Sequence, residues 1–121
     1  MISDSQDYGY EAEKQAAFFL REKGYKILEK NYKTRLGEID LIAKDQGYLV
    51  FIEIKARKIG DFGGPAAAIT STKRKKIIQM AKFYIYVKKI ECDIRFDVVL
   101  ILGPIGAHSV ELIQNAFDLS S

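Results

Sequence analysis

The fold is decided by residues 37–57, which read GEIDLIAKDQGYLVFIEIKAR. Residues 37–43 and 48–57 are rich in β-branched and aromatic side chains, a composition typical of β-strands. The polar segment between them, Asp45-Gln46-Gly47, ends in glycine and favours a tight turn. The stretch therefore predicts a β-hairpin.

The hairpin carries its charges at one end of one face. Side chains alternate between the two faces of a strand, so Glu38 and Asp40 share a face and Ile39 and Leu41 share the other. The same rule applies to residues 48–57, whose alternate positions change from apolar near the turn to charged farther away. The ionic face collects five side chains: Glu38, Asp40, Glu53, Lys55 and Arg57.

The length of the turn sets which charges meet. A two-residue loop at residues 46–47 places Asp40 opposite Glu53 and Glu38 opposite Lys55. Opposed side chains in a sheet have Cβ atoms about 4.5–5.5 Å apart. A plain three-residue loop would instead turn Asp40 away from Glu53, unless a bulge restores the phase.

Two carboxylates facing each other point to a bound cation. Directly opposed like charges destabilise a sheet, so Asp40 and Glu53 need a compensating positive charge. Mg²⁺, or Mn²⁺ in its place, prefers oxygen ligands and often combines one or two carboxylates with waters and phosphate. Lys55 extends from the same face and could position a water or stabilise charge on a phosphate. The alternative is an exposed hairpin laced with surface ion pairs.

The remaining chain predicts helices packed on a sheet. Small and apolar residues at helical spacing predict a helix over 7–23 that ends at Gly24. Strands are expected at 25–34, 94–102 and, shorter, 109–113, with a loop over at least the first half of 58–72 and a turn at 103–106. Thr72 is expected to cap a second helix that runs to about Lys89. The order α-β-β-β-α-β(-β) predicts a single α/β domain over residues 1–121.

Composition narrows the class of protein. The chain has 121 residues, a net charge of +3 and one cysteine, which excludes an internal disulfide and a cysteine-rich zinc site. Its N-terminal residues lack the basic and apolar regions of an export signal, so we expect a cytoplasmic protein without membrane attachment. Basic segments at 21–35 and 57–76 flank the acidic segment 36–56, an arrangement suited to a polyanion held over a metal site.

Four consecutive cations begin the second predicted helix: Lys73, Arg74, Lys75 and Lys76. The N-terminus of a helix already has positive potential, so this placement is unfavourable unless an anion binds there. A nucleic-acid phosphate would provide that anion. The alternative is an ordinary solvated helix face.

The pattern Asp40, then Glu53-Ile54-Lys55, resembles the signature of the PD-(D/E)XK nucleases, with a helical glutamate before it as in archaeal Holliday junction resolvases. A wider set of motifs resembles the YraN-type family of predicted endonucleases over nearly the whole chain. The matching stretches are Gly9-x-x-x-Glu13-x-x-Ala16, Gly24-Tyr25, Asn31, Gly37-Glu38-Ile39-Asp40-Leu41-Ile42, Phe51-Ile52-Glu53-Ile54-Lys55-x-Arg57, Phe62-Gly63, Lys73, Arg95-Phe96-Asp97 and Asn115-Ala116-Phe117. The departures, isoleucines at 52 and 54 where valine is commoner and Ala12 where glycine is frequent, replace no expected ligand.

The resemblance implies a restriction-endonuclease-like core and a Mg²⁺-dependent endonuclease that hydrolyses DNA, including branched, Holliday-junction-like DNA. Asp40 and Glu53 would hold the metal, Lys55 would position water, and Glu13 would orient a ligand or a metal-bound water. Glu38 remains open as a ligand, a partner of Lys55 or Arg57, or a structural group.

The alternative function is a non-catalytic nucleic-acid-binding or assembly module on the same fold. The retained acidic pair and lysine favour the enzyme. The sequence leaves open the form of the DNA and whether a homodimer exists.

Overall fold

The computed structural model describes residues 4–57, 69–103 and 109–119, with every side chain in these ranges except those of residues 4–8 and 57. The elements are α1 (Asp4–Glu22), β1 (Lys26–Thr34), β2 (Gly37–Asp45), β3 (Tyr48–Arg57), α2 (Ser71–Lys88), β4 (Ile94–Leu102) and β5 (Ser109–Phe117). This succession confirms the predicted order. Most of the loop expected at 58–72 and of the turn expected at 103–106 lies outside the described residues.

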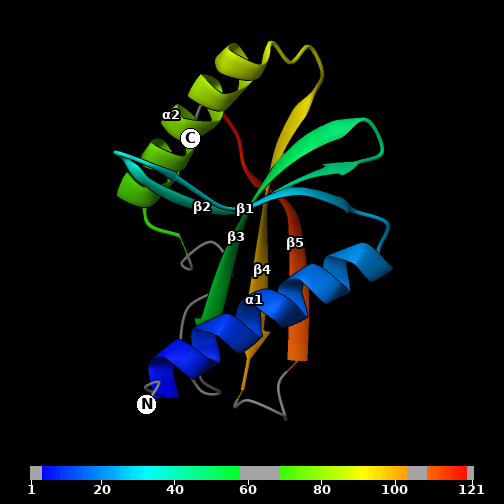
Figure 1. Cartoon of the computed structure of the whole chain (residues 1–121), viewed down its shortest axis with the longest axis vertical. Helices are drawn as coiled ribbons and strands as arrows, with labels where there is room; N and C mark the ends of the chain where they lie inside the picture. The colour runs from blue at the N-terminus through cyan, green and yellow to red at the C-terminus, as the bar shows by residue number, and fades with distance from the viewer. Residues whose placement is uncertain (1–3, 58–68, 104–108, 120–121) are drawn as a thin grey trace.

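The strands form one five-stranded mixed sheet in their chain order (Figure 1). β3 and β4 are parallel, and the other neighbouring pairs are antiparallel. Parallel neighbours require a crossover connection, and α2 belongs to this one. The predicted α/β class and mixed sheet are therefore confirmed.

The two helices cover opposite faces of the sheet. Leu49 and Phe51 of β3 pack in the same cluster as α2, whereas Val50 and Ile52 pack in the same cluster as α1. In Figure 1 α1 crosses in front of the strands and α2 lies toward the upper left. Neither helix, within the described residues, is long and apolar enough to cross a membrane.

Several element boundaries differ from the prediction, and two of the differences have a local reason. The N-cap of α2 is Thr70, whose side-chain oxygen accepts a hydrogen bond from the backbone N–H of Lys73 at 3.1 Å. The prediction of Thr72 is wrong because the chain is already helical from Ser71. β5 also continues beyond Ile113 to Phe117, because a register shift beside Asn115, with its positive φ of 54°, lets pairing with β4 resume.

The predicted hairpin register is correct from the turn as far as Leu41 and Ile52. Asp45 pairs with Tyr48, and the ladder continues in the same register to Leu41 and Ile52. The turn residues Gln46 and Gly47 both have positive φ, at 50° and 88°. A two-residue hairpin turn needs this left-handed geometry to match the twist of its strands, which explains the glycine.

Beyond Leu41 and Ile52 the two strands separate. The free half of β2 stays paired with β1 as far as Gly37, and β3 stays paired with β4 as far as Arg57. The sheet therefore forks, and the predicted pairings of Asp40 with Glu53 and of Glu38 with Lys55 are wrong because β2 has left β3 before either can form.

The fork also breaks the predicted alternation of β2. Ile39 packs in the α2 cluster together with Ile42, whereas Leu41 packs in the α1 cluster. The prediction that Ile39 and Leu41 share a face is thus wrong. From Asp40 to Gly37, β2 is no longer paired with β3. Side chains alternate regularly between the two faces only where the strand pairing is regular.

A buried polar network joins β2, β4 and β5 to Tyr25, the residue just before β1. The guanidinium of Arg95 donates to Asp97 Oδ2 at 2.9 Å and to Asp45 Oδ2 at 2.8 Å. The hydroxyl of Tyr25, whose pKa burial raises to about 12, donates to Asp97 Oδ2 at 2.7 Å. Asp97 is fully buried and also accepts from the backbone N–H of Asn115. Its charge is matched by donors on several elements, as burial requires.

Candidate functional site

Asp40 lies at the point where the sheet forks. Its Oδ2 accepts a hydrogen bond of 2.7 Å from the backbone N–H of Ile54. The carboxylate thereby satisfies a β3 donor just past the last paired residues, Leu41 and Ile52. Asp40 is held by both branches of the fork, so its position depends on how the sheet divides.

Three carboxylates from two elements meet at this point. Glu13 of α1 and Glu38 and Asp40 of β2 each offer one oxygen, and these oxygens lie within 4.8 Å of one another. Glu13 is placed there because its neighbours Ala12 and Ala16 are buried against the sheet. The structure thus brings the predicted Glu13 and Asp40 together, and it places Glu38 with them rather than with Lys55.

Asn31 connects two of these carboxylates. With its amide nitrogen turned toward them, Asn31 donates to Glu38 Oε1 at 2.5 Å and to Glu13 Oε1 at 3.1 Å. Its backbone is left-handed, with a φ of 53°, a conformation that asparagine tolerates better than most residues. Asn31 therefore fixes the spacing between α1 and β2 at the site.

Glu53 is buried beside the cluster and has only part of its polar capacity satisfied. Its residue is 4% exposed, and its Oε1 forms an ion pair with Lys73 Nζ from the first turn of α2. Its Oε2 is buried and has no hydrogen-bond partner among the described residues. A buried oxygen of this kind calls for a donor or a cation.

The electrostatics at the fork make Asp40 hard to ionise. Burial first, and then the nearby charge of Glu53, raise the pKa of Asp40 to about 7, although the backbone N–H of Ile54 opposes the rise. Burial alone would lower the pKa of Lys73, but its hydrogen bond and charge interaction with Glu53 raise it. The pKa values of Asp40 and Lys73 therefore both depend on the charge of Glu53.

Lys55 and Arg57 contribute less to the observed cluster than the sequence predicts. Lys55 is half-buried on β3, where its backbone is paired with that of Leu100, and it makes no ion pair within the described part of the chain. The side chain of Arg57 lies outside the described residues. The cation beside Glu53 is instead Lys73, for which the sequence predicts nucleic-acid binding.

The four cations at the start of α2 have different roles. Lys73 reaches the buried carboxylate, whereas Arg74 folds back and donates to the backbone carbonyl of Ile69 at 2.9 Å. Lys75 and Lys76 are exposed. Only part of the predicted basic cluster is therefore available to a polyanion in solution.

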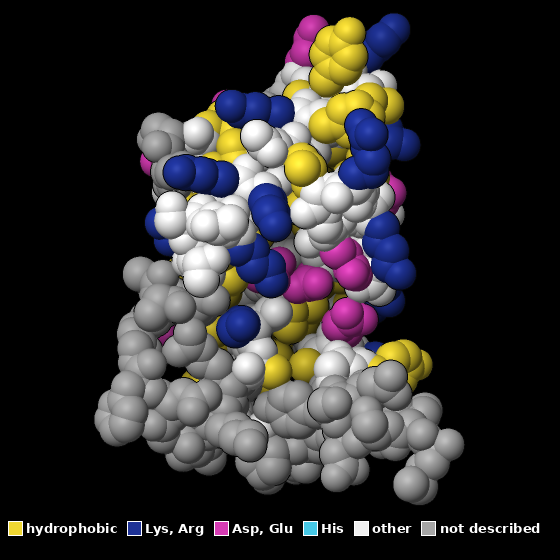
Figure 2. Space-filling model, turned by 90° about the vertical axis from the view of Figure 1, so that its left-hand side faces the viewer, with side chains coloured by type: hydrophobic (Ala, Val, Ile, Leu, Met, Phe, Trp, Pro, Cys, Tyr) yellow, Lys and Arg dark blue, Asp and Glu magenta, His cyan; other side chains and the backbone are white. Residues whose placement is uncertain are grey.

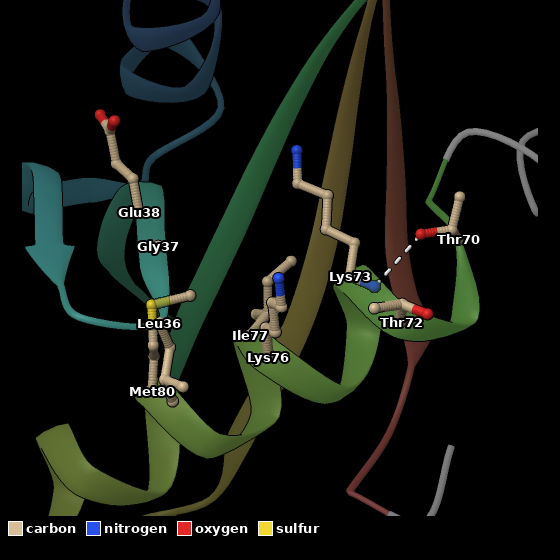
Figure 3. Close-up of a pocket in the computed structure, with 9 residues that line it drawn as sticks. All are labelled: Leu36, Gly37, Glu38, Thr70, Thr72, Lys73, Lys76, Ile77 and Met80. Carbon is tan, nitrogen blue, oxygen red and sulfur yellow. Dashed lines mark hydrogen bonds between the residues drawn. The ribbon is translucent and has the colours of Figure 1, made fainter.

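A cavity of about 320 Å³ opens beside the site, between β2 and the first turns of α2. In Figure 3 the side chains of Glu38 and Lys73 extend in the same direction from these two elements, and Lys76 lies farther along the helix. Figure 2 shows acidic side chains gathered near the middle of one face, with Lys and Arg side chains around and above them. Basic side chains therefore lie beside an acidic group on the described part of this face, as the charge pattern predicts, although most of the basic segment 57–76 before α2 lies outside the described residues.

The donor set fits a hard divalent cation. Every candidate ligand is a carboxylate oxygen, the type that Mg²⁺ and Mn²⁺ prefer. The unpartnered Oε2 of Glu53 is an independent sign that a positive group belongs there. The oxygens close enough to share an ion come from Glu13, Glu38 and Asp40. Glu53, the other predicted ligand, is not part of this group, and its Oε1 is paired with Lys73.

Comparison with known proteins places the chain in a family. Residues 12–101 match the uncharacterised protein family UPF0102. The chain belongs to the UPF0102 family. Relatives that carry this name include proteins of Desulfosudis oleivorans, 44% identical over 98% of this chain and 95% of that protein, and of Thermodesulfovibrio yellowstonii, 45% identical over 92% and 96%.

A further UPF0102 protein, from Nitrosomonas europaea, is 41% identical over 98% of this chain and its own full length. The matched family region contains Glu13, Asp40, Glu53 and Lys73, so the whole fork lies inside it. The family is described as uncharacterised, and its name assigns no activity to these residues.

Sequence reasoning missed two functional contacts. Asn31 entered only as a residue of the family resemblance, although an asparagine within a strand, where this residue type is rare, is a local signal. Lys73 entered as a phosphate ligand and as a residue of the family resemblance, but not as a partner of Glu53, because nothing local shows that the start of α2 approaches β3.

Proposed function

We propose that the UPF0102 chain is a divalent-metal-dependent nuclease of the PD-(D/E)XK type that hydrolyses phosphodiester bonds in DNA. The observation that carries the proposal is the fork, where carboxylates from α1 and β2 converge and the charge of Asp40 interacts with that of Glu53 on β3, whose Oε2 is buried and has no hydrogen-bond partner among the described residues. The α/β fold and the motif order support a restriction-endonuclease-like core.

Each side chain has a role that follows from its placement. Asp40 and Glu53 would hold Mg²⁺ or Mn²⁺, and Glu13, oriented by Asn31, would position a ligand or a water. The metal would supply a lowered water pKa and polarisation of a phosphoryl oxygen. Lys55 would place positive charge near the reacting phosphate, and Lys75 and Lys76 would hold the DNA backbone.

The second candidate is a non-catalytic nucleic-acid-binding module. The ion pair between Lys73 and Glu53 favours it, because a lysine can neutralise Glu53 without any metal. Both candidates bind nucleic acid, so only turnover and metal binding separate them. Under either candidate we propose that the protein acts in the cytoplasm, as a monomer or as a homodimer.

The separating experiment compares cleavage and metal binding in matched variants. Plasmid, linear and branched DNA are incubated with Mg²⁺ or Mn²⁺ and the parent, Asp40→Asn or Glu53→Gln. Glu91→Gln serves as a control, because this exposed carboxylate lies beyond the far end of α2. We expect cleavage by the parent and the control only. Calorimetry should show Mn²⁺ binding lost in both site variants, and undiminished affinity would remove the metal from the proposal.

Lys55→Met tests the catalytic role of the motif lysine. Removing one preorganised charge from a transition state slows reactions by roughly 10²–10³-fold. We expect that loss in the single-turnover cleavage rate, with DNA and Mn²⁺ affinity nearly unchanged. A variant that cleaves at the parental rate would transfer the role to another cation, whereas a parent that binds every DNA form without cleaving any would favour the binding module.

A further inference from the structure

A second cavity adjoins the one at the fork. It has a volume of about 350 Å³ and lies between the end of β1, the β1–β2 turn and the middle of α2. Its lining residues, which define the β1–α2 groove, are Tyr32, Lys33, Thr34, Arg35, Leu36, Gln79, Met80 and Phe83. Leu36 and Met80 also line the cavity that contains Glu38 and Lys73. The groove therefore leads toward the carboxylates.

The charged side chains that line the groove and the adjoining cavity are positive, except at the end where the carboxylates lie. Lys33 and Arg35 line the groove and Lys76 lines the adjoining cavity, and all three are exposed. None of them forms an ion pair within the described ranges. Among the described residues that line the two cavities, the single acidic one is Glu38, at the end occupied by the carboxylates. Unpaired cations that lead to an acidic centre complement a chain of phosphates.

The groove also contains an exposed aromatic ring. Phe83 is 57% exposed and Leu36 is 44% exposed, although both line the groove with the buried Met80. Single exposed apolar residues are common on protein surfaces. An aromatic face in the same groove as unpaired cations is more specific, because a nucleic-acid strand offers both bases and phosphates.

We propose that the β1–α2 groove binds an unpaired nucleic-acid strand and guides it to the fork. Phosphates would contact Lys33, Arg35 and Lys76, and one base would stack on Phe83. In a duplex the base faces are covered by their neighbours, so stacking on Phe83 requires an unpaired base. A cavity of this volume also matches one small ligand group rather than the width of a duplex. The substrate class is thus single-stranded DNA, or the unpaired part of a branched molecule.

The inference rests on the proposed nuclease function only for what happens after binding. Binding itself can be measured without a metal. Fluorescence anisotropy with a labelled oligothymidylate, in EDTA, is compared with a blunt duplex of the same length. We expect the parent to bind the single strand more tightly than the duplex.

Phe83→Leu keeps the apolar character and removes the aromatic face. We expect single-strand affinity to fall about tenfold, within the range typical of one base–aromatic stack, and duplex affinity to stay unchanged. Tyr86→Leu is the matched control, because Tyr86 lies on the same helix, is 82% exposed and does not line the groove. Both side chains are exposed, and far-UV circular dichroism verifies that both variants fold.

Lys33→Gln combined with Arg35→Gln tests the phosphate contacts. On a single strand, the slope of log affinity against log salt concentration should decrease by about 0.7 for each phosphate that is no longer bound. An unchanged slope overturns the assignment of phosphates to these side chains. Equal losses in the Phe83 and Tyr86 variants overturn the groove, as does competition by poly-glutamate at equal charge, which would indicate an acidic peptide as the ligand.

Cleavage assays with Mn²⁺ separate the two proposals. If the parent prefers single strands, loses that preference in Phe83→Leu and cleaves no DNA, the proposal of strand binding in the groove stands and the proposal of nuclease activity is wrong. A parent that cleaves duplex as readily as single-stranded DNA, with Phe83→Leu unaffected, removes the groove and leaves the nuclease.

Discussion

At the scale of single residues, the fork is a place where charge and burial conflict. Asp40 is held by the backbone N–H of Ile54, yet burial and the charge of Glu53 raise its pKa to about 7. A carboxylate in that position destabilises the fold when it ionises. Such conflicts are common where ligands bind, because the ligand relieves them.

Asp40→Asn should therefore remove a pH dependence of stability. The folded-state pKa of about 7 exceeds the ordinary value of 3.8, so the stabilisation is present below pH 4 and is lost as the pH rises through 7. In the variant, the free energy of unfolding at pH 8 should exceed that of the parent by on the order of 2–4 kcal/mol, with the gap closing by pH 4. Urea denaturation measures both. A constant gap across this range would contradict the prediction, and Glu91→Gln provides the control.

Lys73→Met should destabilise the protein because it leaves Glu53 buried without its cation. Breaking a buried pair costs about 3–5 kcal/mol, but the side chain of Lys73 is 47% exposed, so we expect about 1–2 kcal/mol. Mn²⁺ should restore more stability to this variant than to Lys75→Met, whose exposed lysine serves as the control. Thermal unfolding with and without Mn²⁺ tests this, and equal metal effects in the two variants would count against it.

At the scale of elements, the first turn of α2 is the part of the helix that reaches the candidate site. Thr70 caps the helix and so fixes the turn from which Lys73 extends toward β3. The helix carries no acidic residue in its first turn, so this cap is the main compensation for its exposed N–H groups.

Thr70→Ala should lower the free energy of unfolding by about 1 kcal/mol, since it removes the N-cap acceptor. Thr72→Ala should change it by less than about 0.5 kcal/mol, because Thr72 is an exposed residue within the first turn. Chemical denaturation of the two variants provides a direct comparison. Equal effects would return the cap to Thr72 and contradict the observed hydrogen bond.

At the scale of the whole molecule, two clusters of charged side chains differ in how completely their carboxylate oxygens are hydrogen-bonded. Every carboxylate oxygen of Asp97 has donors, from Arg95, Tyr25 and Asn115. The cluster at the fork leaves Oε2 of Glu53 without a hydrogen-bond partner among the described residues and crowds several carboxylates together. The first arrangement stabilises the sheet, and the second is suited to a ligand.

Asp97→Asn should destabilise the protein by about 3–5 kcal/mol, the loss typical of breaking a buried charge pair. Added salt should change this difference little, because buried pairs are weakly screened. The exposed Glu111→Gln on β5 is the control and should be nearly neutral. Urea titrations at low and high salt measure both effects. A loss below about 1 kcal/mol would show that the network adds little to the sheet.

The sequence by itself determined the elements and the hairpin register. Period-two patterns identify β2 and β3, and the turn at Gln46-Gly47 sets their pairing as far as Leu41 and Ile52. The sequence alone thus predicts that Asp40 and Glu53 lie near each other, and their charges do interact. These features are local: side-chain alternation and turn geometry depend on residues close together in the chain.

The tertiary structure decided how the site is completed. The fork at Leu41, the approach of Glu13 from α1 and the ion pair of Lys73 with Glu53 all join segments far apart in the chain. No local period encodes where a helix lies on a sheet, or which long side chain reaches a buried charge. For this reason the strand pattern predicts Lys55 beside the carboxylates, whereas the packing of α2 places Lys73 there.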